Sequence, residues 1–206
     1  MKTNDILKVL DEVVPNPKCS LNYSKDYELL IAVMLSAQST DDRVNIVTNE
    51  LFKYNLKELA SLDINTIENI IRPVGTFTRK ALYLKNIATR LLNDYGGVVP
   101  ADREYIESLP GVGHKTCNVV LNELYDIPAI AVDTHVSRVS KRLGLTSSDS
   151  DVVKIEKDLM DLFPEKSWGR VHLQLLLFGR HTCKSKKPLC NSCPFKNNIC
   201  KQKDLL

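Results

Sequence analysis

The sequence predicts an all-α fold, and three observations lead to that prediction. Apolar residues recur at helical spacing along most of the chain, capping residues and Gly or Pro punctuate them, and no segment shows the two-residue alternation of a half-buried strand. The chain has 206 residues, of which 43% are hydrophobic and 26% are charged. This length and composition suit one domain or two small ones with a substantial core.

Five helices are predicted in the first half of the chain. The first ends at Pro15, and the second is the apolar stretch YELLIAVML, which the polar SAQSTD closes. Asp41 is predicted to cap the third helix, Pro73 follows the fourth, and a Gly-Gly pair ends the fifth. These helices span residues 5–14, 27–35, 41–52, 65–71 and 79–92.

Five more helices are predicted in the second half. One precedes a glycine turn, one follows it, and Asp133 is predicted to cap the next. These helices span residues 101–109, 115–125, 133–143, 150–163 and 167–180. The loops between them are short and none is of low complexity, so no flexible linker is expected.

The charges are distributed unevenly. Residues 166–203 contain nine Lys and Arg and no Asp or Glu, so the rest of the chain has 19 basic and 25 acidic residues. A basic end on an acidic body indicates a polyanionic partner, although a solvated tail is the alternative. No apolar run approaches the roughly 20 residues that span a bilayer, and the charged first fifteen residues do not predict a signal peptide. We therefore expect a cytoplasmic protein without a membrane partner.

The stretch LPGVGHKT, at residues 109–116, predicts a helix, a tight turn and a second helix. Gly111 and Gly113 can adopt positive φ and leave the backbone uncovered, so N–H groups from Val112 onward would face a phosphate at a helix N-terminus. An ordinary connection between packed helices is the alternative. The pattern resembles the helix-hairpin-helix, which grips the DNA backbone. The residues expected at the DNA are Gly111, Val112, Gly113, His114 and Thr116.

Lys115 lies at the start of the second helix of this hairpin. The positive end of the helix dipole and partial burial against the apolar face would both lower its pKa and increase the fraction of free amine. A free amine can attack a sugar carbon and form a Schiff base. The alternative is a lysine that only neutralises a phosphate, and the residues alone favour that alternative.

Four of the six cysteines form the pattern CKSKKPLCNSCPFKNNIC. Cys183, Cys190, Cys193 and Cys200 are separated by six, two and six residues, a spacing with only one of the two CxxC knuckles typical of a zinc ribbon. Four thiolates in so short a segment suit one compact iron–sulfur cube better, with zinc as the alternative. The loop between the first two cysteines contains Lys184, Lys186 and Lys187, which predict a phosphate-binding finger.

The hairpin, the segment IAVDTHVSRVSKRLGL and the four cysteines together resemble the endonuclease III family of DNA base-excision glycosylases. The resemblance covers nearly the whole chain. It implies two helical domains with a DNA-binding cleft between them. A six-helix barrel with the helix-hairpin-helix would span residues 21–128, and a [4Fe-4S] cluster domain would combine residues 1–20 with 129–206.

The same resemblance implies a function. A member of the family removes oxidised pyrimidines from double-stranded DNA and cleaves the resulting abasic site by β-elimination. Lys115 would be the nucleophile and Asp133, in VDTH, the second catalytic group. The expected partner is duplex DNA with damaged bases or abasic sites, and the protein is expected to act as a monomer.

Two segments are expected to enter the DNA after the damaged base has left the stack. Gln38, in LSAQSTD, would fill the vacated space and contact the orphaned base. A second wedge is a leucine in a GLY segment of the family, but here the segment is Gly75-Thr76-Phe77, so the wedge is Thr76 or Phe77. The last cysteine gap also differs, being six residues where the family has five.

Four other functions share features with this one. An adenine-mismatch glycosylase lacks the nucleophilic lysine and carries an additional C-terminal domain, so Lys115 and the chain length disfavour it. A sister enzyme for thymine mismatches or pyrimidine dimers stays open, because the residues that choose the substrate are not identifiable. A non-catalytic DNA-binding module is disfavoured by Lys115 together with Asp133, and a zinc deaminase is excluded because no H-x-E accompanies the CxxC.

Overall fold

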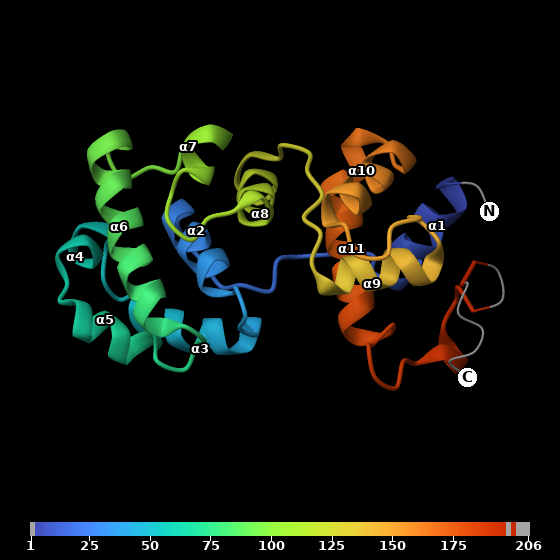
Figure 1. The fold of residues 1–206 in the computed structure, drawn as a ribbon, viewed down its shortest axis with the longest axis horizontal. Coiled ribbons are helices and arrows are strands. Elements are labelled where there is room, and N and C mark those ends of the chain that lie inside the picture. Colours follow the sequence, from blue (N-terminus) through green and yellow to red (C-terminus); the bar gives the residue numbers. More distant parts are fainter. Residues whose placement is uncertain (1–2, 197–198, 201–206) are drawn as a thin grey trace. The chain divides into compact units, whose positions relative to one another are not determined.

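A computed structural model gives the structure of the protein and describes residues 3–196 and 199–200. Lys201 and Lys203, which belong to the basic end, lie outside the described residues. The described chain is helical and contains no strand, which confirms the predicted all-α class (Figure 1). Within the same residues, no helix is long and apolar enough to cross a membrane.

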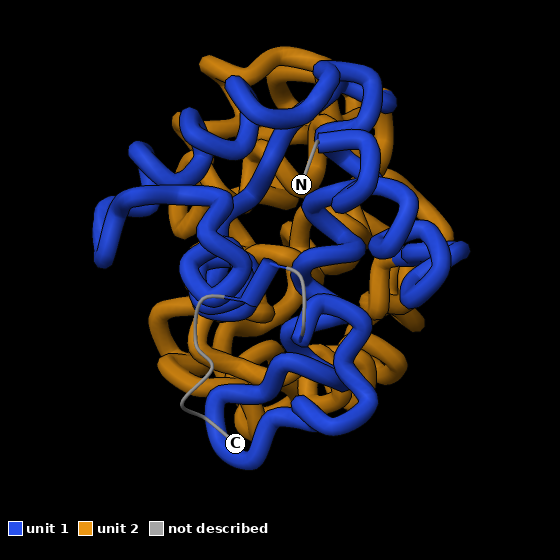
Figure 2. The backbone as a smooth tube through the Cα atoms, turned by 90° about the vertical axis from the view of Figure 1, so that its right-hand side faces the viewer, with its two compact units in different colours: residues 1–18, 126–206 blue, residues 19–125 orange. Residues whose placement is uncertain are grey.

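The chain divides into two compact units (Figure 2). Unit 2 is continuous and runs over residues 19–125, whereas unit 1 combines residues 1–18 with 126–206. The assignment of a barrel domain over 21–128 and of a cluster domain to the remainder stays a prediction.

Unit 2 contains seven helices along its described residues: α2 (Asp26–Leu35), α3 (Asp41–Leu51), α4 (Leu56–Ser61), α5 (Ile64–Ile71), α6 (Phe77–Tyr95), α7 (Arg103–Glu107) and α8 (His114–Tyr125). Helix α2 is the centre of this unit, because every residue from Tyr27 to Leu35 is buried. Its apolar sequence is therefore explained by burial on all sides rather than on one stripe. Helices α3, α6 and α8 pack against it, and α6 also packs against α4 and α5.

Unit 1 is formed by elements from both ends of the chain. They are α1 (Thr3–Val13), α9 (Thr134–Leu143), α10 (Val152–Leu162), α11 (Trp168–His181) and two short 3₁₀ segments, η1 (Glu165–Ser167) and η2 (Cys190–Ser192). Helices α1 and α9 both pack against α11. The core includes Leu10, Val136 and Leu175, and Phe195 from the cysteine-rich segment lies fully buried in edge-to-face contact with Phe178. The cysteine-rich segment is thus anchored in the core by an aromatic side chain.

Capping residues decide where several helices begin. Asp133 accepts hydrogen bonds from the N–H groups of His135 and Val136, so the predicted cap of α9 is confirmed. The predicted cap of α3 is wrong, because Thr40 rather than Asp41 accepts the hydrogen bond, from Arg43 N–H. Thr40 precedes two acidic residues that then lie in the first turn, where the helix dipole favours them.

One helix was missed and one is shorter than predicted. Helix α4 begins after Asn55, whose side chain accepts from Glu58 N–H while the Glu58 carboxylate accepts from Asn55 N–H. This capping box was present in the sequence as N-x-x-E. The helix predicted over residues 101–109 is reduced to α7, because Asp102 caps it and Ser108 ends it.

Candidate functional site

The glycine turn between α7 and α8 depends on one of its two glycines for its backbone. Gly111 has φ 77°, and a Cβ atom there would lie 2.4 Å from the ring of Tyr83. Only glycine therefore fits this position. Gly113 lies outside the left-handed region, and no heavy atom lies within 4 Å of the place its Cβ would take. Gly113 thus leaves an open approach to the backbone.

The N-terminus of α8 presents unpaired backbone donors. The N–H groups of Gly113, Lys115 and Thr116 have no acceptor in the described part of the chain. The prediction was wrong for Val112, whose N–H donates to Leu109 O at 3.1 Å and whose side chain is buried. Three open donors at the start of a twelve-residue helix form a site for an anion, because the helix dipole is positive there.

His114 links the two helices of the hairpin. Its Nδ1 lies 3.1 Å from Oε1 of Glu107 on α7, and its Nε2 lies 3.3 Å from the side-chain amide of Asn118. Burial raises the pKa of Glu107, but hydrogen bonds from Arg103 and His114 outweigh it and the net direction is downward. The imidazole is therefore held between a carboxylate of α7 and an amide of its own helix.

Lys115 is the second residue of α8, and its side chain is exposed. The partial burial that we predicted for it is absent. The ammonium has no hydrogen-bond or ion-pair partner among the described residues. This side chain is consequently available to an incoming substrate.

Asp133 combines a structural contact with an open oxygen. Its Oδ1 accepts both capping hydrogen bonds, at 2.8 Å from His135 N and 2.7 Å from Val136 N. Its Oδ2 has no hydrogen-bond partner in the described part of the chain, and the side chain is half-buried. The cap fixes the direction of the carboxylate and leaves one oxygen for another role.

Gln38 and Thr76, the two residues predicted to enter DNA, share an unusual backbone. Their φ values are 57° and 55°, in the left-handed region that side chains other than glycine rarely adopt. Both residues are exposed. Phe77, the alternative wedge, is the first residue of α6 and is only half-exposed, with the Arg72 guanidinium 6.0 Å from its ring centroid.

Lys80 is a residue of this region that the sequence analysis missed. It lies in the first turns of α6 with only 3% of its surface exposed, and its ammonium donates to oxygen atoms on either side of Gln38. Helix α6 has four basic residues, Arg79, Lys80, Lys85 and Arg90, and nothing in their spacing indicates that Lys80 turns inward.

Two arginines of α9 hold the loop that follows α11. Arg138 donates from Nε to Cys183 O at 3.1 Å and from Nη2 to Gly179 O at 2.8 Å. Arg142 donates from Nη1 to Lys184 O at 2.7 Å and lies 3.4 Å from Cys183 Sγ. The side chains of Lys184, Lys186 and Lys187 are exposed on this loop. The structure therefore presents three cations on a loop whose base is fixed by backbone contacts.

The four C-terminal cysteines are neighbours in space. All six cysteines lie in the described part of the chain and are thiols. Burial raises the pKa of the Cys193 thiol, and the charges of Cys183, Cys200 and Cys190 raise it further. Within the described residues, no group of three or more His, Cys, Asp or Glu side chains is arranged to hold a metal ion.

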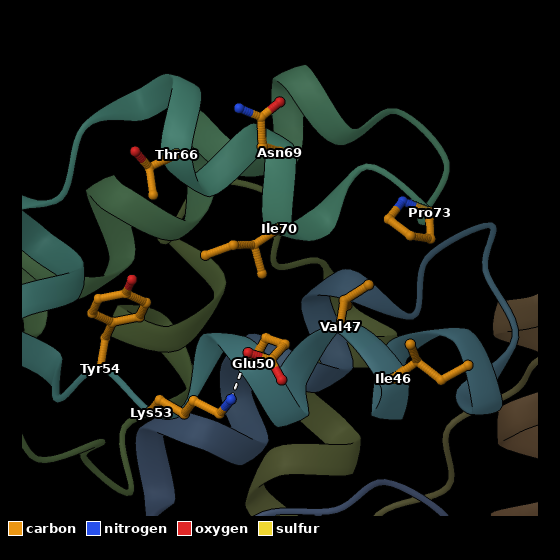
Figure 3. Close-up of a pocket in the computed structure, with 9 residues that line it drawn as sticks. All are labelled: Ile46, Val47, Glu50, Lys53, Tyr54, Thr66, Asn69, Ile70 and Pro73. Carbon is orange, nitrogen blue, oxygen red and sulfur yellow. Dashed lines mark hydrogen bonds and ion pairs between the residues drawn. The ribbon is translucent and has the colours of Figure 1, made fainter.

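A pocket of unit 2 is separate from all of these residues. It has a volume of about 520 Å³ and lies between α3 and α5 (Figure 3). An ion pair of Lys53 and Glu50 forms part of its wall. None of the predicted site residues lines it; the lining residues are Ile46, Val47, Glu50, Lys53, Tyr54, Thr66, Asn69, Ile70 and Pro73. We therefore do not assign the chemistry to this pocket.

Comparison with known proteins identifies the class to which this fold and hairpin belong. Residues 31–165 match the model of the HhH-GPD superfamily of base excision DNA repair proteins, and the chain belongs to this family. Within it, the similarity is to endonuclease III. The chain is 41% identical to endonuclease III of Bacillus subtilis over 95% of its own length and 90% of that protein. It is 39% identical to endonuclease III of Escherichia coli, with coverage of 98% and 96%.

The similarity extends to solved structures. A trapped covalent intermediate of endonuclease III with DNA superposes with a TM-score of 0.90 and 40% identity, and covers 98% of this chain and 97% of that one. A non-covalent complex of endonuclease III with DNA gives a TM-score of 0.91 and 41% identity. A thermostable thymine-DNA glycosylase, at 23% identity, shares the fold with a TM-score of 0.85.

Proposed function

We propose that this protein is a bifunctional DNA glycosylase and abasic-site lyase of base excision repair. It removes oxidised pyrimidines from duplex DNA and cleaves the abasic site by β-elimination. The observation that carries the proposal is the exposed amine of Lys115 beside three open N–H donors at the N-terminus of α8. Family membership and the covalent DNA complex of the related endonuclease III support it.

The chemistry proposed for Lys115 has two stages. Its free amine attacks C1′ of the damaged nucleotide, the bond to the base breaks, and the base departs with a proton. The resulting adduct opens the sugar ring and becomes an imine between Nζ and C1′. The imine acidifies the adjacent C2′–H, so loss of that proton expels the 3′-phosphate and breaks the strand.

The role proposed for Asp133 is electrostatic. Positive charge develops on the sugar as the base leaves, and a carboxylate stabilises such charge and assists proton transfer. The open Oδ2 supports this role, because the cap occupies only Oδ1. Asp133→Asn keeps the capping oxygen but removes the charge, so we expect the fold to persist and the rate to fall by about 10²–10³.

Three regions are proposed to bind the DNA. The open donors of Gly113 and Thr116 would hold one phosphate, with His114 beside them. The exposed Lys186 and Lys187, together with Lys184, would hold the backbone elsewhere through charge alone. Gln38 and Thr76 would enter the stack. The protein is proposed to act as a monomer in the cytoplasm, on the DNA of the nucleoid.

The thiols of Cys183, Cys190, Cys193 and Cys200 are proposed to hold a [4Fe-4S] cluster. The chemistry of the donors fits, because four thiols lie in one short segment and three of them lie close enough to Cys193 to raise its pKa. A cube of four irons takes one thiolate for each iron, so its ligands are more widely spaced than those of one zinc. When bound, the cluster supplies a rigid cross-link of the loop. Visible absorption and iron content of the purified protein distinguish it from zinc.

The decisive experiment traps the imine. Borohydride reduces it to a stable amine, so a radiolabelled duplex with one oxidised pyrimidine should become covalently attached to the wild-type protein. Lys115→Gln retains much of the side-chain length but has no nucleophilic amine. We expect this variant to bind the same duplex and to form no trapped complex.

The matched control is Lys85→Met, which removes the ammonium of another lysine of unit 2, bound to Leu62 O, and should still be trapped. If Lys115→Gln is trapped at the wild-type rate, another amine is the nucleophile and the proposal for Lys115 is wrong. If no damaged duplex is processed or trapped by the wild-type protein, the enzymatic function itself is wrong and a DNA-binding module remains.

A further inference from the structure

The turn that carries Gln38 and the turn that carries Thr76 lie against each other. Ser39 Oγ accepts a hydrogen bond from Gly75 N–H at 3.0 Å. A Cβ atom added to Gly75 would lie 3.2 Å from Gln38 O, which is tighter than ordinary contact. Gln38 and Thr76 are therefore held at neighbouring turns that depend on each other for position.

The buried ammonium of Lys80 holds the turn at Gln38, and the backbone of Lys80 contacts the turn at Thr76. Lys80 Nζ donates to Ala37 O at 2.6 Å and lies 3.3 Å from Ser39 Oγ, so its contacts bracket Gln38 on both sides. It also donates to Leu35 O at 2.8 Å, at the C-terminus of α2, where the helix dipole favours a cation. The backbone N–H of the same residue donates to Thr76 O at 3.1 Å. A single residue thus contacts both turns.

Burying the Lys80 ammonium costs free energy, which indicates that the buried position has a specific role. Lys80 is 3% exposed, and burial lowers its pKa. Its three acceptors are neutral oxygens, and it forms no ion pair with any described carboxylate. Lysine is rarely buried without a counter-ion, because an unneutralised charge is desolvated there. The three oxygen acceptors offset this desolvation cost. The hydrogen bonds to them also fix the turn that contains the strained Gln38.

We propose that Lys80 is a positioning residue that holds Gln38 and Thr76 in the backbone conformation with which they enter duplex DNA. The proposal rests on the DNA glycosylase function and on the intercalating role of Gln38. Lys80 contacts no substrate. It acts by keeping the Gln38 turn, the Ser39 hydroxyl and the Thr76 turn in one arrangement before the DNA arrives.

The test compares duplex and single-stranded substrates. Lys80→Met keeps the length and the apolar stem but removes the donors. A single-stranded abasic site has no partner base and no stack to open, so its cleavage needs Lys115 but not the two turns. We expect Lys80→Met to slow processing of an oxidised pyrimidine in duplex DNA by about tenfold or more. Cleavage of the single-stranded abasic site should stay at the wild-type rate.

Lys85→Met is the matched control. Lys85 lies on the same helix and is half-buried, and its Nζ donates to Leu62 O at 2.5 Å, away from both turns. This variant loses a lysine–carbonyl hydrogen bond but should process both substrates at the wild-type rate. 2-Aminopurine placed opposite the lesion reports opening of the stack, and its fluorescence increase on binding should be reduced in Lys80→Met and normal in Lys85→Met.

A double-mutant cycle separates this proposal from the proposed function. If Lys80 acts through Gln38, Lys80→Met should add little to the loss already caused by Gln38→Ala. An unimpaired Gln38→Ala would overturn the role of Gln38 itself. An impaired Gln38→Ala with a normal Lys80→Met would overturn only the role of Lys80. An equal loss on duplex and single strand would also overturn it, because that result indicates general support of the fold.

Ser39→Ala keeps the test decisive if Lys80→Met does not fold. It removes the acceptor that Lys80 and the N–H of Gly75 share, and because Ser39 is small and only half-buried, the substitution is mild. A loss confined to duplex substrate supports the proposal. A wild-type rate on duplex overturns it.

Discussion

The glycine turn before α8 and the turns at Gln38 and Thr76 all need a left-handed backbone, and they obtain it with different residue types. All three place a residue in the left-handed region. At the first turn the residue is Gly111, which adopts that conformation without steric cost. At the other two it carries a side chain, and such a residue costs about 1–2 kcal/mol there. The side chain is retained in spite of the cost.

The difference reflects which part of each residue meets the ligand. The turn before α8 offers backbone N–H groups, so a side chain at Gly111 or Gly113 would only obstruct. The turns at Gln38 and Thr76 offer side chains, so glycine is unsuitable and the backbone must be held from outside. Hydrogen bonds from Lys80 supply that restraint. Strain is thus tolerated where a side chain is needed and absent where the backbone suffices.

Among variants at these turns, Gly111→Ala is expected to have the largest effect on stability. The new Cβ would meet the Tyr83 ring at 2.4 Å on a backbone with φ 77°. We expect the free energy of unfolding to fall by about 2–4 kcal/mol, from strain and overpacking together. Urea denaturation measures it. A loss in unfolding free energy no larger than that of an ordinary surface substitution would show that the turn can relax and does not require glycine.

Gln38→Ala should affect activity rather than stability. The side chain is exposed, so the melting temperature should change little. Single-turnover excision from duplex DNA should slow by about tenfold, the size expected when one or two hydrogen bonds are lost. A large drop in melting temperature would instead mean that Gln38 supports the fold, and the contrast with the glycine turn would lose its meaning.

Thr76→Gly should stabilise the protein. Thr76 precedes α6 with a left-handed backbone and makes no side-chain capping bond to that helix. Glycine removes the strain but loses more backbone entropy on folding, so we expect a net gain of about 0.5–1 kcal/mol in the free energy of unfolding. Thermal denaturation of the variant beside the wild type measures this gain. A destabilised variant would show that the Thr76 backbone is not strained.

Gly113→Ala should have a small effect on stability and a clear one on DNA binding. Its Cβ would enter open space, and Gly113 does not use positive φ, so a loss of about 0.5 kcal/mol is expected from the helix start alone. DNA affinity should fall nonetheless, because the methyl group covers the donors. Fluorescence anisotropy with an undamaged duplex checks this. Unchanged affinity would place the phosphate elsewhere.

Much of the fold was predictable because its determinants are local. Asp133, the glycine turn and the apolar α2 each carry a short-range pattern that specifies a cap, a turn or a buried helix. Helix α4 was also predictable in principle, since Asn55 and Glu58 form a capping box. Asp41 was assigned the wrong role because two adjacent residues, Thr40 and Asp41, both suit an N-cap.

The site was predictable only where its chemistry follows a motif. Lys115 was found from the hairpin, but its exposure was not, because burial of a side chain depends on residues distant in sequence. Lys80 was missed for the same reason. Its acceptors lie more than forty residues earlier in the chain, and no local pattern indicates that this lysine turns inward.

Helix α9 also sets the distance between Asp133 and the basic loop of unit 1. Asp133 caps its first turn, and Arg138 and Arg142 bind the loop at Cys183 and Lys184 from the turns that follow. Ten helical residues extend about 15 Å as one stiff rod. The distance between the carboxylate and the basic loop is therefore set by helix geometry rather than by loops. A one-residue insertion in α9 would rotate and shift one relative to the other, so this helix is expected to tolerate substitutions far better than changes of length.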